Sequence, residues 1–179
     1  MSFNDKLYEL VTKPENWEIA KKISDNMDSF VKRLIEEFWK EIGENIKKKF
    51  NLEDWEVSIL DSTEKTIRHS QWVDSFFVSF GVDTGKGGKT FLGWWWKNYK
   101  YKEDLQLLSK LKKVDSQITK QEGEFPGFFY IDDDPLSLLE QILPLNRQLL
   151  VEKYSNMIIK FIENTNRKAT DIKKILNSR

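Results

Sequence analysis

The sequence predicts a single α+β domain in which a long N-terminal helix and C-terminal helices bracket an aromatic-rich antiparallel sheet of four to five strands. Near both ends of the chain, apolar residues recur every three or four positions, which is the period of a helix. In the middle, short runs rich in β-branched and aromatic residues are separated by polar or glycine-containing turns, which is the pattern of antiparallel strands. The order helix, strands, helices is typical of the α+β class.

The N-terminal third predicts one long helix over residues 15–50. Pro14 and Glu15 suit its start, and the cations Lys47, Lys48 and Lys49 complement the helix dipole at its end. At about 1.5 Å per residue this helix is roughly 50 Å long, which is more than a small sheet can cover. We therefore expect either the C-terminal helices or a second subunit to pack on it. The apolar positions that define its face are Ile23, Met27, Phe30, Val31, Leu34, Ile35, Phe38, Ile42 and Ile46.

The remainder of the chain divides into a strand region at 55–101 and a mostly helical region at 103–179, which has one further strand near 128–131. A single domain that spans residues 1–179 is within the usual size range of protein domains. The predicted strands are 55–60, 66–72, 75–82, 90–101 and 125–131. The predicted helices after the sheet are 103–114, 135–143, 145–164 and 170–176.

Composition excludes several classes of function. The chain has no cysteine, so disulfides, cysteine-ligated zinc, iron–sulfur clusters and thiol catalysis are excluded, and a reducing compartment is favoured. The N-terminus lacks a signal-peptide pattern, and no apolar run approaches the roughly 20 residues that span a bilayer. We expect a cytoplasmic protein without a membrane partner or a cofactor. The 29 basic and 29 acidic residues cancel, which disfavours a dedicated nucleic-acid-binding domain.

Two motifs lack the context that their chemistry needs. The run from Gly85 to Thr90 ends in Gly-Lys-Thr, as a phosphate-binding loop does, but such a loop requires a helix directly after the lysine. Here an aromatic, strand-like run follows, so a hairpin turn is predicted instead. His69 is the single histidine, and no nucleophile motif accompanies it, so we interpret it as structural or exposed.

The acidic run Asp132, Asp133 and Asp134 is the candidate metal site. Three adjacent carboxylates after a strand suit Mg²⁺, which gives a metal-dependent phosphodiesterase or nuclease as an alternative function. The competing interpretation is a helix cap, because Asp134 precedes Pro135, a residue favoured in the first turn of a helix. A restriction-like nuclease would also need Asp/Glu-x-Lys on a strand, and the nearest match, 98–100, begins with asparagine.

Aromatic density marks the candidate binding surface. Alternation along the strand places Trp94 and Trp96 on one face and Trp95 on the other. If one face of the sheet is open, these rings form a platform for a protein partner or for stacked bases. If both faces are covered, they fill the core. The predicted binding residues are Trp72, Trp94, Trp96, Lys97, Tyr99 and Lys100, whose lysines fringe the rings.

The order of these features resembles the C-terminal accessory region of bacterial PD-(D/E)XK nuclease-like family proteins. Phe38-Trp39 in a long helix is followed by a strand at Trp55, by the run 67–72 (Ile-Arg-His-Ser-Gln-Trp), by a phenylalanine-rich strand, and by Gly93-Trp94-Trp95-Trp96. The catalytic acids and lysine of that family lie in a separate core that this chain lacks, so no catalytic residue carries over. The resemblance implies a non-catalytic partner- or ligand-sensing domain in a phage or phage-defence setting.

The leading functional hypothesis is therefore a non-enzymatic binding or interaction protein with a protein partner. Two alternatives stay open: the metal-dependent hydrolase centred on Asp132–Asp134, and a single-stranded nucleic-acid binder that uses the aromatic sheet. A homodimer formed through the long N-terminal helix is compatible with each of them.

Overall fold

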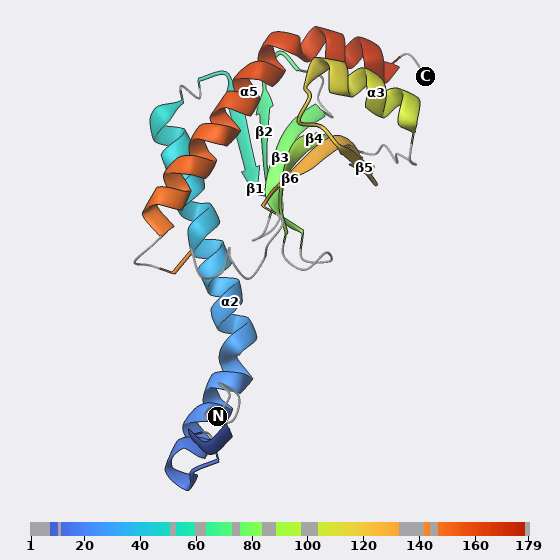
Figure 1. The fold of residues 1–179 in the computed structure, drawn as a ribbon. Coiled ribbons are helices and arrows are strands. Elements are labelled where there is room, and N and C mark those ends of the chain that lie inside the picture. The colour runs from blue at the N-terminus through green and yellow to red at the C-terminus, as the bar shows by residue number, and fades with distance from the viewer. Residues whose placement is uncertain are drawn as a thin grey trace. The chain divides into compact units, whose positions relative to one another are not determined.

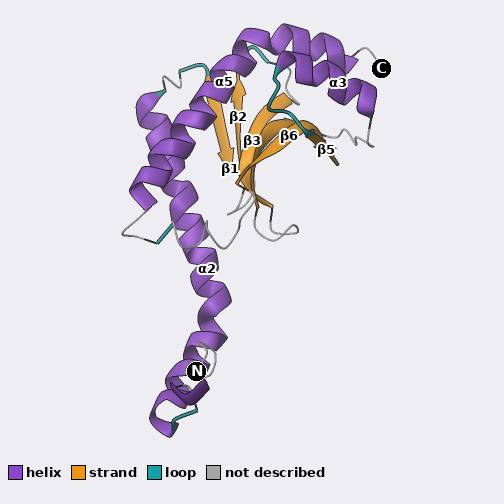
Figure 2. Cartoon of the chain, in the orientation of Figure 1, coloured by secondary structure: helices purple, strands orange, loops and turns teal. Residues whose placement is uncertain are grey.

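The computed structural model describes residues 8–10, 12–50, 53–59, 64–72, 76–83, 89–97, 104–132, 142–143 and 147–177. Within these residues, long helices accompany a six-stranded antiparallel sheet, which confirms the predicted α+β class (Figures 1 and 2). The helices are α2 (Pro14–Lys49), α3 (Leu105–Val114) and α5 (Arg147–Asn177). The strands are β1 (Trp55–Ile59), β2 (Glu64–His69), β3 (Phe76–Asp83), β4 (Lys89–Trp96), β5 (Lys120–Glu122) and β6 (Phe125–Asp132).

The sheet has the strand order β1-β2-β3-β4-β6-β5, and every neighbouring pair is antiparallel. The first four strands form the predicted meander, since each pairs with the next one along the chain. In the β3–β4 hairpin, Asp83 lies opposite Lys89, so the glycine-rich run between them connects two strands. A strand, and not the helix of a phosphate-binding loop, follows the lysine.

The chain groups into two compact units, Met1–Leu34 and Ile35–Arg179, and α2 crosses the division between them. In the first unit, most described side chains of α2 are exposed. In the second, the last turns of α2 bury Phe38, Trp39, Ile42 and Ile46. The Trp39 ring lies 5.8 Å from the Phe80 ring of β3, which ties this part of the helix to the sheet.

Helix α5 covers one face of the sheet (Figure 1). The Phe161 ring lies 5.7 Å from the ring of Trp94 on β4 and 5.8 Å from that of Phe129 on β6. Ion pairs connect the first residue of α5 to the second half of α2, because Arg147 binds Glu37 and Glu41. Helix α3 packs on the other end of α5. The core therefore lies between the sheet and these helices.

Helix α5 is one continuous helix, whereas the sequence predicts separate helices at 145–164 and 170–176. The linking residues 165–169 contain no proline or glycine to end a helix, and the buried face continues through Thr165 and Ile172. The two predicted helices are thus wrong as separate elements. Most of the predicted helix at 135–143 lies outside the described residues. In the described part of the chain, no helix is both long and apolar enough to cross a bilayer.

Candidate protein-interaction surface

The tryptophans predicted to form a platform lie in the core. Trp94, Trp96 and Trp72 are 1%, 4% and 7% exposed. The indole N–H of Trp94 donates to Thr165 Oγ1 of α5 at 2.9 Å, and that of Trp72 donates to Asn166 Oδ1 at 3.0 Å. Of the two arrangements that the sequence leaves open, the structure therefore shows the covered one for this face of the strand, because α5 lies over it, and these three rings do not form the predicted binding platform.

The lysine fringe is only partly described. Lys97 is exposed directly after β4. Tyr99 and Lys100 lie outside the described residues, so their predicted binding role stays a prediction. The structure therefore does not bring the six predicted binding residues together on one exposed surface within its described part.

The opposite face of the sheet carries aromatic rings that are partly exposed. Trp95 and Phe77 pair across β3 and β4 with ring centroids 5.2 Å apart, and Arg68 lies 5.9 Å over the Phe77 ring. The Trp95 indole donates to Glu124 Oε2 at 2.8 Å. Sequence alternation separates Trp95 from its neighbours but does not say which face α5 covers, so Trp95 and Phe77 were missed as candidates.

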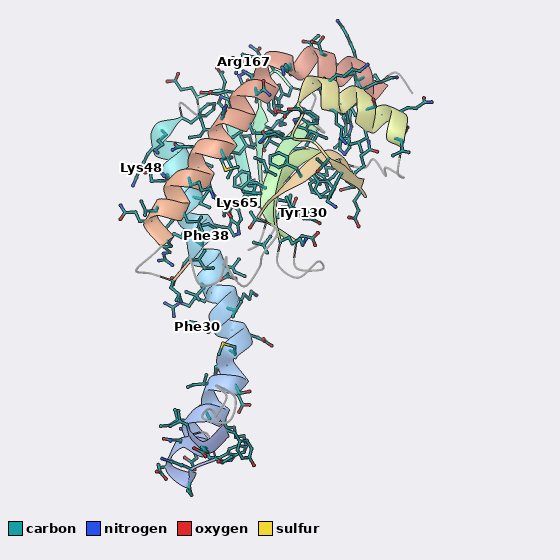
Figure 3. The ribbon with its side chains drawn as sticks, in the orientation of Figure 1. Phe30, Phe38, Lys48, Lys65, Tyr130 and Arg167 are labelled. Atoms are coloured by element: carbon teal, nitrogen blue, oxygen red, sulfur yellow. The ribbon has the colours of Figure 1, made fainter. Side chains whose placement is uncertain are left out.

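Tyr130 of β6 extends this face (Figure 3). The ammonium groups of Lys89 and Lys120 each lie 5.3 Å from its ring centroid, and its hydroxyl donates to Asp83 Oδ2 at 3.0 Å. Tyr130 thus has two cations over its ring and a carboxylate bound to its hydroxyl. This arrangement fixes the cations by cation–π attraction.

The first unit presents a different kind of surface, the apolar face of α2 that consists of Ile19, Ile23, Met27 and Phe30. These four side chains are between 45% and 59% exposed, and they follow one another at the spacing of one helix face (Figure 3 labels Phe30). With Lys22 and Asn26 they line a hollow of about 460 Å³. A contiguous row of large exposed apolar side chains is typical of an interaction site. The sequence predicts the helix and the spacing of its apolar residues. From that spacing we expect other helices or a second subunit to pack along the whole apolar face.

A pocket of about 330 Å³ lies in the second unit beneath α5. Its polar groups include Asp115, which accepts from Asn164 Nδ2 at 2.7 Å and from the Gln117 backbone N–H at 3.0 Å. The bond from Asn164 joins the end of α3 to α5, and the bond from Gln117 closes the turn that follows α3, so this part of the pocket has a structural use. The described lining is Leu92, Asp115, Gln117, Phe129, Met157, Lys160, Phe161, Asn164 and Arg167.

His69 is buried against aromatic rings, which agrees with the structural interpretation. Its ring centroid lies 4.6 Å from that of Trp55, and its Nδ1 accepts from the Gln71 backbone N–H at 3.1 Å. The described residues contain no group of three His, Cys, Asp or Glu side chains that gathers to hold a metal. Asp133 and Asp134 lie outside the described residues, and of Asp132 only the backbone, which pairs with Thr90, is described. The metal site stays a prediction.

Lys65 is a buried cation beneath α2 (Figure 3). It lies opposite Phe80 in the sheet, and its side chain passes Gly43 of α2. Burial lowers the pKa of Lys65 below its ordinary value of 10.5, and the charge of Lys47 lowers this pKa further. An ammonium at this position therefore opposes folding.

We expect Lys65→Met to stabilise the protein most at pH values below the lowered pKa of Lys65. The unfolded chain keeps its proton at Lys65 up to a pKa of 10.5, whereas the folded chain loses it at lower pH. The unfolded state thus binds more protons between these two pKa values, and the free energy of unfolding of the wild type rises with pH through this interval. Urea denaturation at increasing pH should show the advantage of the variant shrinking. Lys48→Met, at an exposed position, controls for the lost charge, and an advantage that does not change with pH would contradict the expectation.

The described part of the chain therefore offers three candidate surfaces: the Trp95–Tyr130 side of the sheet, the pocket beneath α5, and the apolar face of α2. In the first two, the polar and charged groups described above are engaged with neighbouring side chains. The apolar face of α2 instead leaves four large hydrophobic side chains about half in water. No protein-family model, curated protein or solved structure matches this chain.

Proposed function

We propose that the protein is a non-enzymatic interaction module that binds a protein partner through the apolar face of α2. The observation that supports this function is the exposure of Ile19, Ile23, Met27 and Phe30. Water contact with such a row is unfavourable by about 25 cal/mol for each Å² of apolar surface, so covering it stabilises a complex. Helical faces with anchors at these spacings are a recurrent mode of protein recognition.

The charges around this face favour a protein over a membrane or a nucleic acid. Between Glu15 and Arg33 the helix carries four acidic and four basic residues. Helices that lie on anionic membranes are rich in lysine and arginine on their polar side, and phosphate backbones likewise need a basic surface. A balanced set of charges around an apolar row is instead typical of a helix that packs on another protein.

The other functions raised by the sequence have less support. The aromatic platform for nucleic acid relied on Trp94 and Trp96, which are buried. The hydrolase depends on Asp133 and Asp134, which lie outside the described residues. A place as a partner-sensing domain in a phage or phage-defence setting follows only from the resemblance to accessory regions of PD-(D/E)XK proteins, and it is part of this proposal.

Phe30→Asp should strongly weaken partner binding and leave the fold intact. The substitution puts a carboxylate in the middle of an interface that would be dry, which we expect to weaken binding at least about tenfold, or 1.4 kcal/mol. Because Phe30 is exposed, the cost to stability should stay within about 1 kcal/mol. The measurement is quantitative affinity capture from lysate of the native host, with circular dichroism to verify folding.

Ser29→Asp is the matched control for this experiment. Ser29 is exposed and adjacent to Phe30, but its side chain points about 100° away from that of Phe30 around the helix. The Ser29→Asp substitution therefore adds the same negative charge as Phe30→Asp but places it outside the apolar face. The proposal requires a stoichiometric protein that the wild type and Ser29→Asp capture and that Phe30→Asp loses. Equal capture by all three proteins, or capture of no protein by the wild type, would refute the proposed function.

A further inference from the structure

We infer that the partner on the apolar face of α2 is a second copy of this chain, whose own α2 docks antiparallel. This inference rests on the proposed function and names its partner. Four residues that are exposed or partly exposed on α2 follow a coiled-coil spacing. Steps of three, four and three residues separate Ala20, Ile23, Met27 and Phe30, which is the spacing of the two seam positions of a coiled coil.

The sizes of these residues define a register for two antiparallel copies. With a twofold axis at the level of Asp25, residues whose numbers sum to about 50 lie opposite each other. Ala20 of one copy then faces Phe30 of the other, and Ile23 faces Met27. The smallest seam residue thus meets the largest, and the layers interdigitate as well-packed cores do.

The charges along the helix match the same register. Acidic and basic residues alternate in pairs: Glu15 and Glu18, Lys21 and Lys22, Asp25 and Asp28, Lys32 and Arg33. In the antiparallel register each acidic pair of one copy comes within about two residues, or roughly 3 Å along the axis, of a basic pair of the other. In a parallel pair of helices in register, each acidic pair would instead face the same acidic pair of the other copy, and each basic pair the same basic pair. Repulsion between like charges opposes such an association.

The pairs also lie on the correct sides of the helix. Glu15 and Arg33 are 18 residues, or five full turns, apart, so they share one side of the apolar face. Lys21 and Asp28 are seven residues apart and share the other side. In an antiparallel twofold pair each side faces the same side of the other copy, so Arg33 lies on the side of Glu15 and Lys21 on the side of Asp28. These charges stand about 100–140° around the helix from the apolar seam, so they act as complementary potentials along its flanks and not as contacts within it. The charge pattern of α2 is therefore complementary to that of a second, antiparallel copy of the same helix. Binding to a partner of different sequence would not require this self-complementarity.

Oligomeric state provides the first test. By light scattering and sedimentation, the wild type and Ser29→Asp should form dimers that dissociate on dilution. Phe30→Asp should be a monomer at the same concentrations, with at least a tenfold weaker association. A wild type that stays monomeric at the highest soluble concentration overturns the inference. The proposed function still stands in that case if the lysate experiment captures a different protein that Phe30→Asp loses.

Disulfide trapping provides the second test, which is clean because the chain has no cysteine of its own. The Ile23→Cys and Met27→Cys variants are made as separate proteins, and one of them carries a larger tag so that the two can be told apart by size. Each variant is oxidised alone, and a mixture of the two is oxidised in parallel. The antiparallel register predicts a disulfide only between the two different variants, because Cα atoms more than about 7 Å apart do not form a disulfide. Asp25→Cys, on the outer side of the helix, should form none. Disulfides within each single variant would show a parallel pair and overturn the inference, as would equal trapping when Phe30→Asp is added.

Discussion

Trp94→Ala is expected to lower the free energy of unfolding by about 3–5 kcal/mol, which is much of the stability of a typical domain. The Trp94 side chain is 1% exposed, and its ring packs on Phe161 of α5. Its removal leaves a cavity between the sheet and the helix, and Thr165 loses the indole N–H that it accepts from. Urea denaturation followed by far-UV circular dichroism measures this loss.

Trp95→Ala is the matched comparison, one residue along the same strand. Trp95 is partly exposed and lies on the face away from α5, so we expect a loss of only about 1–2 kcal/mol. If the two substitutions cost the same, or if Trp94→Ala stays within about 1 kcal/mol of the wild type, the assignment of Trp94 to the core is wrong. If Trp94→Ala lowers the free energy of unfolding this much, the variant cannot be used to test the predicted binding platform. A loss of binding would then result from unfolding and not from removal of a contact with a partner.

Gly93→Ala should be as disruptive, although it adds one methyl group. A Cβ at this position would lie 2.3 Å from the Cβ of Phe128 and 2.6 Å from the carbonyl oxygen of Gly127. Both neighbours belong to β6, which pairs with β4 at this point, so strand backbone would have to move. We expect a loss of at least about 3 kcal/mol, measured as the shift in the urea midpoint.

Gly43→Ala controls for the loss of a glycine. Gly43 lies in α2, and the nearest atoms to an added Cβ are those of the Lys65 side chain at 3.9 Å. Alanine is favoured over glycine inside a helix by about 0.5–1 kcal/mol, so this variant should be more stable than the wild type. A Gly93→Ala protein with unchanged stability would mean that β4 and β6 do not approach as closely as described.

The sequence identifies the elements whose pattern is long and regular, because the period of α2 and the alternation of the meander are local properties. It misses β5, whose three residues Lys120–Glu122 are polar, form a sheet edge and carry no alternation. It also predicts two helices where the structure has the single helix α5, because residues 165–169 contain few apolar side chains. None of these residues is of a type that ends a helix. Local pattern is insufficient in both places.

The candidate surfaces depend on contacts between distant parts of the chain, which explains why they were harder to predict. Alternation separates Trp94 from Trp95, but α5, some seventy residues later, decides which of the two is buried. Likewise, the apolar period of α2 continues evenly from Ile23 to Ile46, although its first part is exposed and its last part is buried. The sequence carries no local mark of that change.

The position of α5 after all six strands in chain order has a consequence for synthesis of the protein. The ribosome completes β1 to β6 before it makes the helix that covers them, and Arg147 must then reach Glu37, which left the ribosome about 110 residues earlier. Until then the rings of Trp94, Phe129 and their neighbours are exposed to water in the nascent chain, and exposed hydrophobic surface favours aggregation. We therefore expect a chain cut short before Arg147 to lack this cover and to be prone to aggregation.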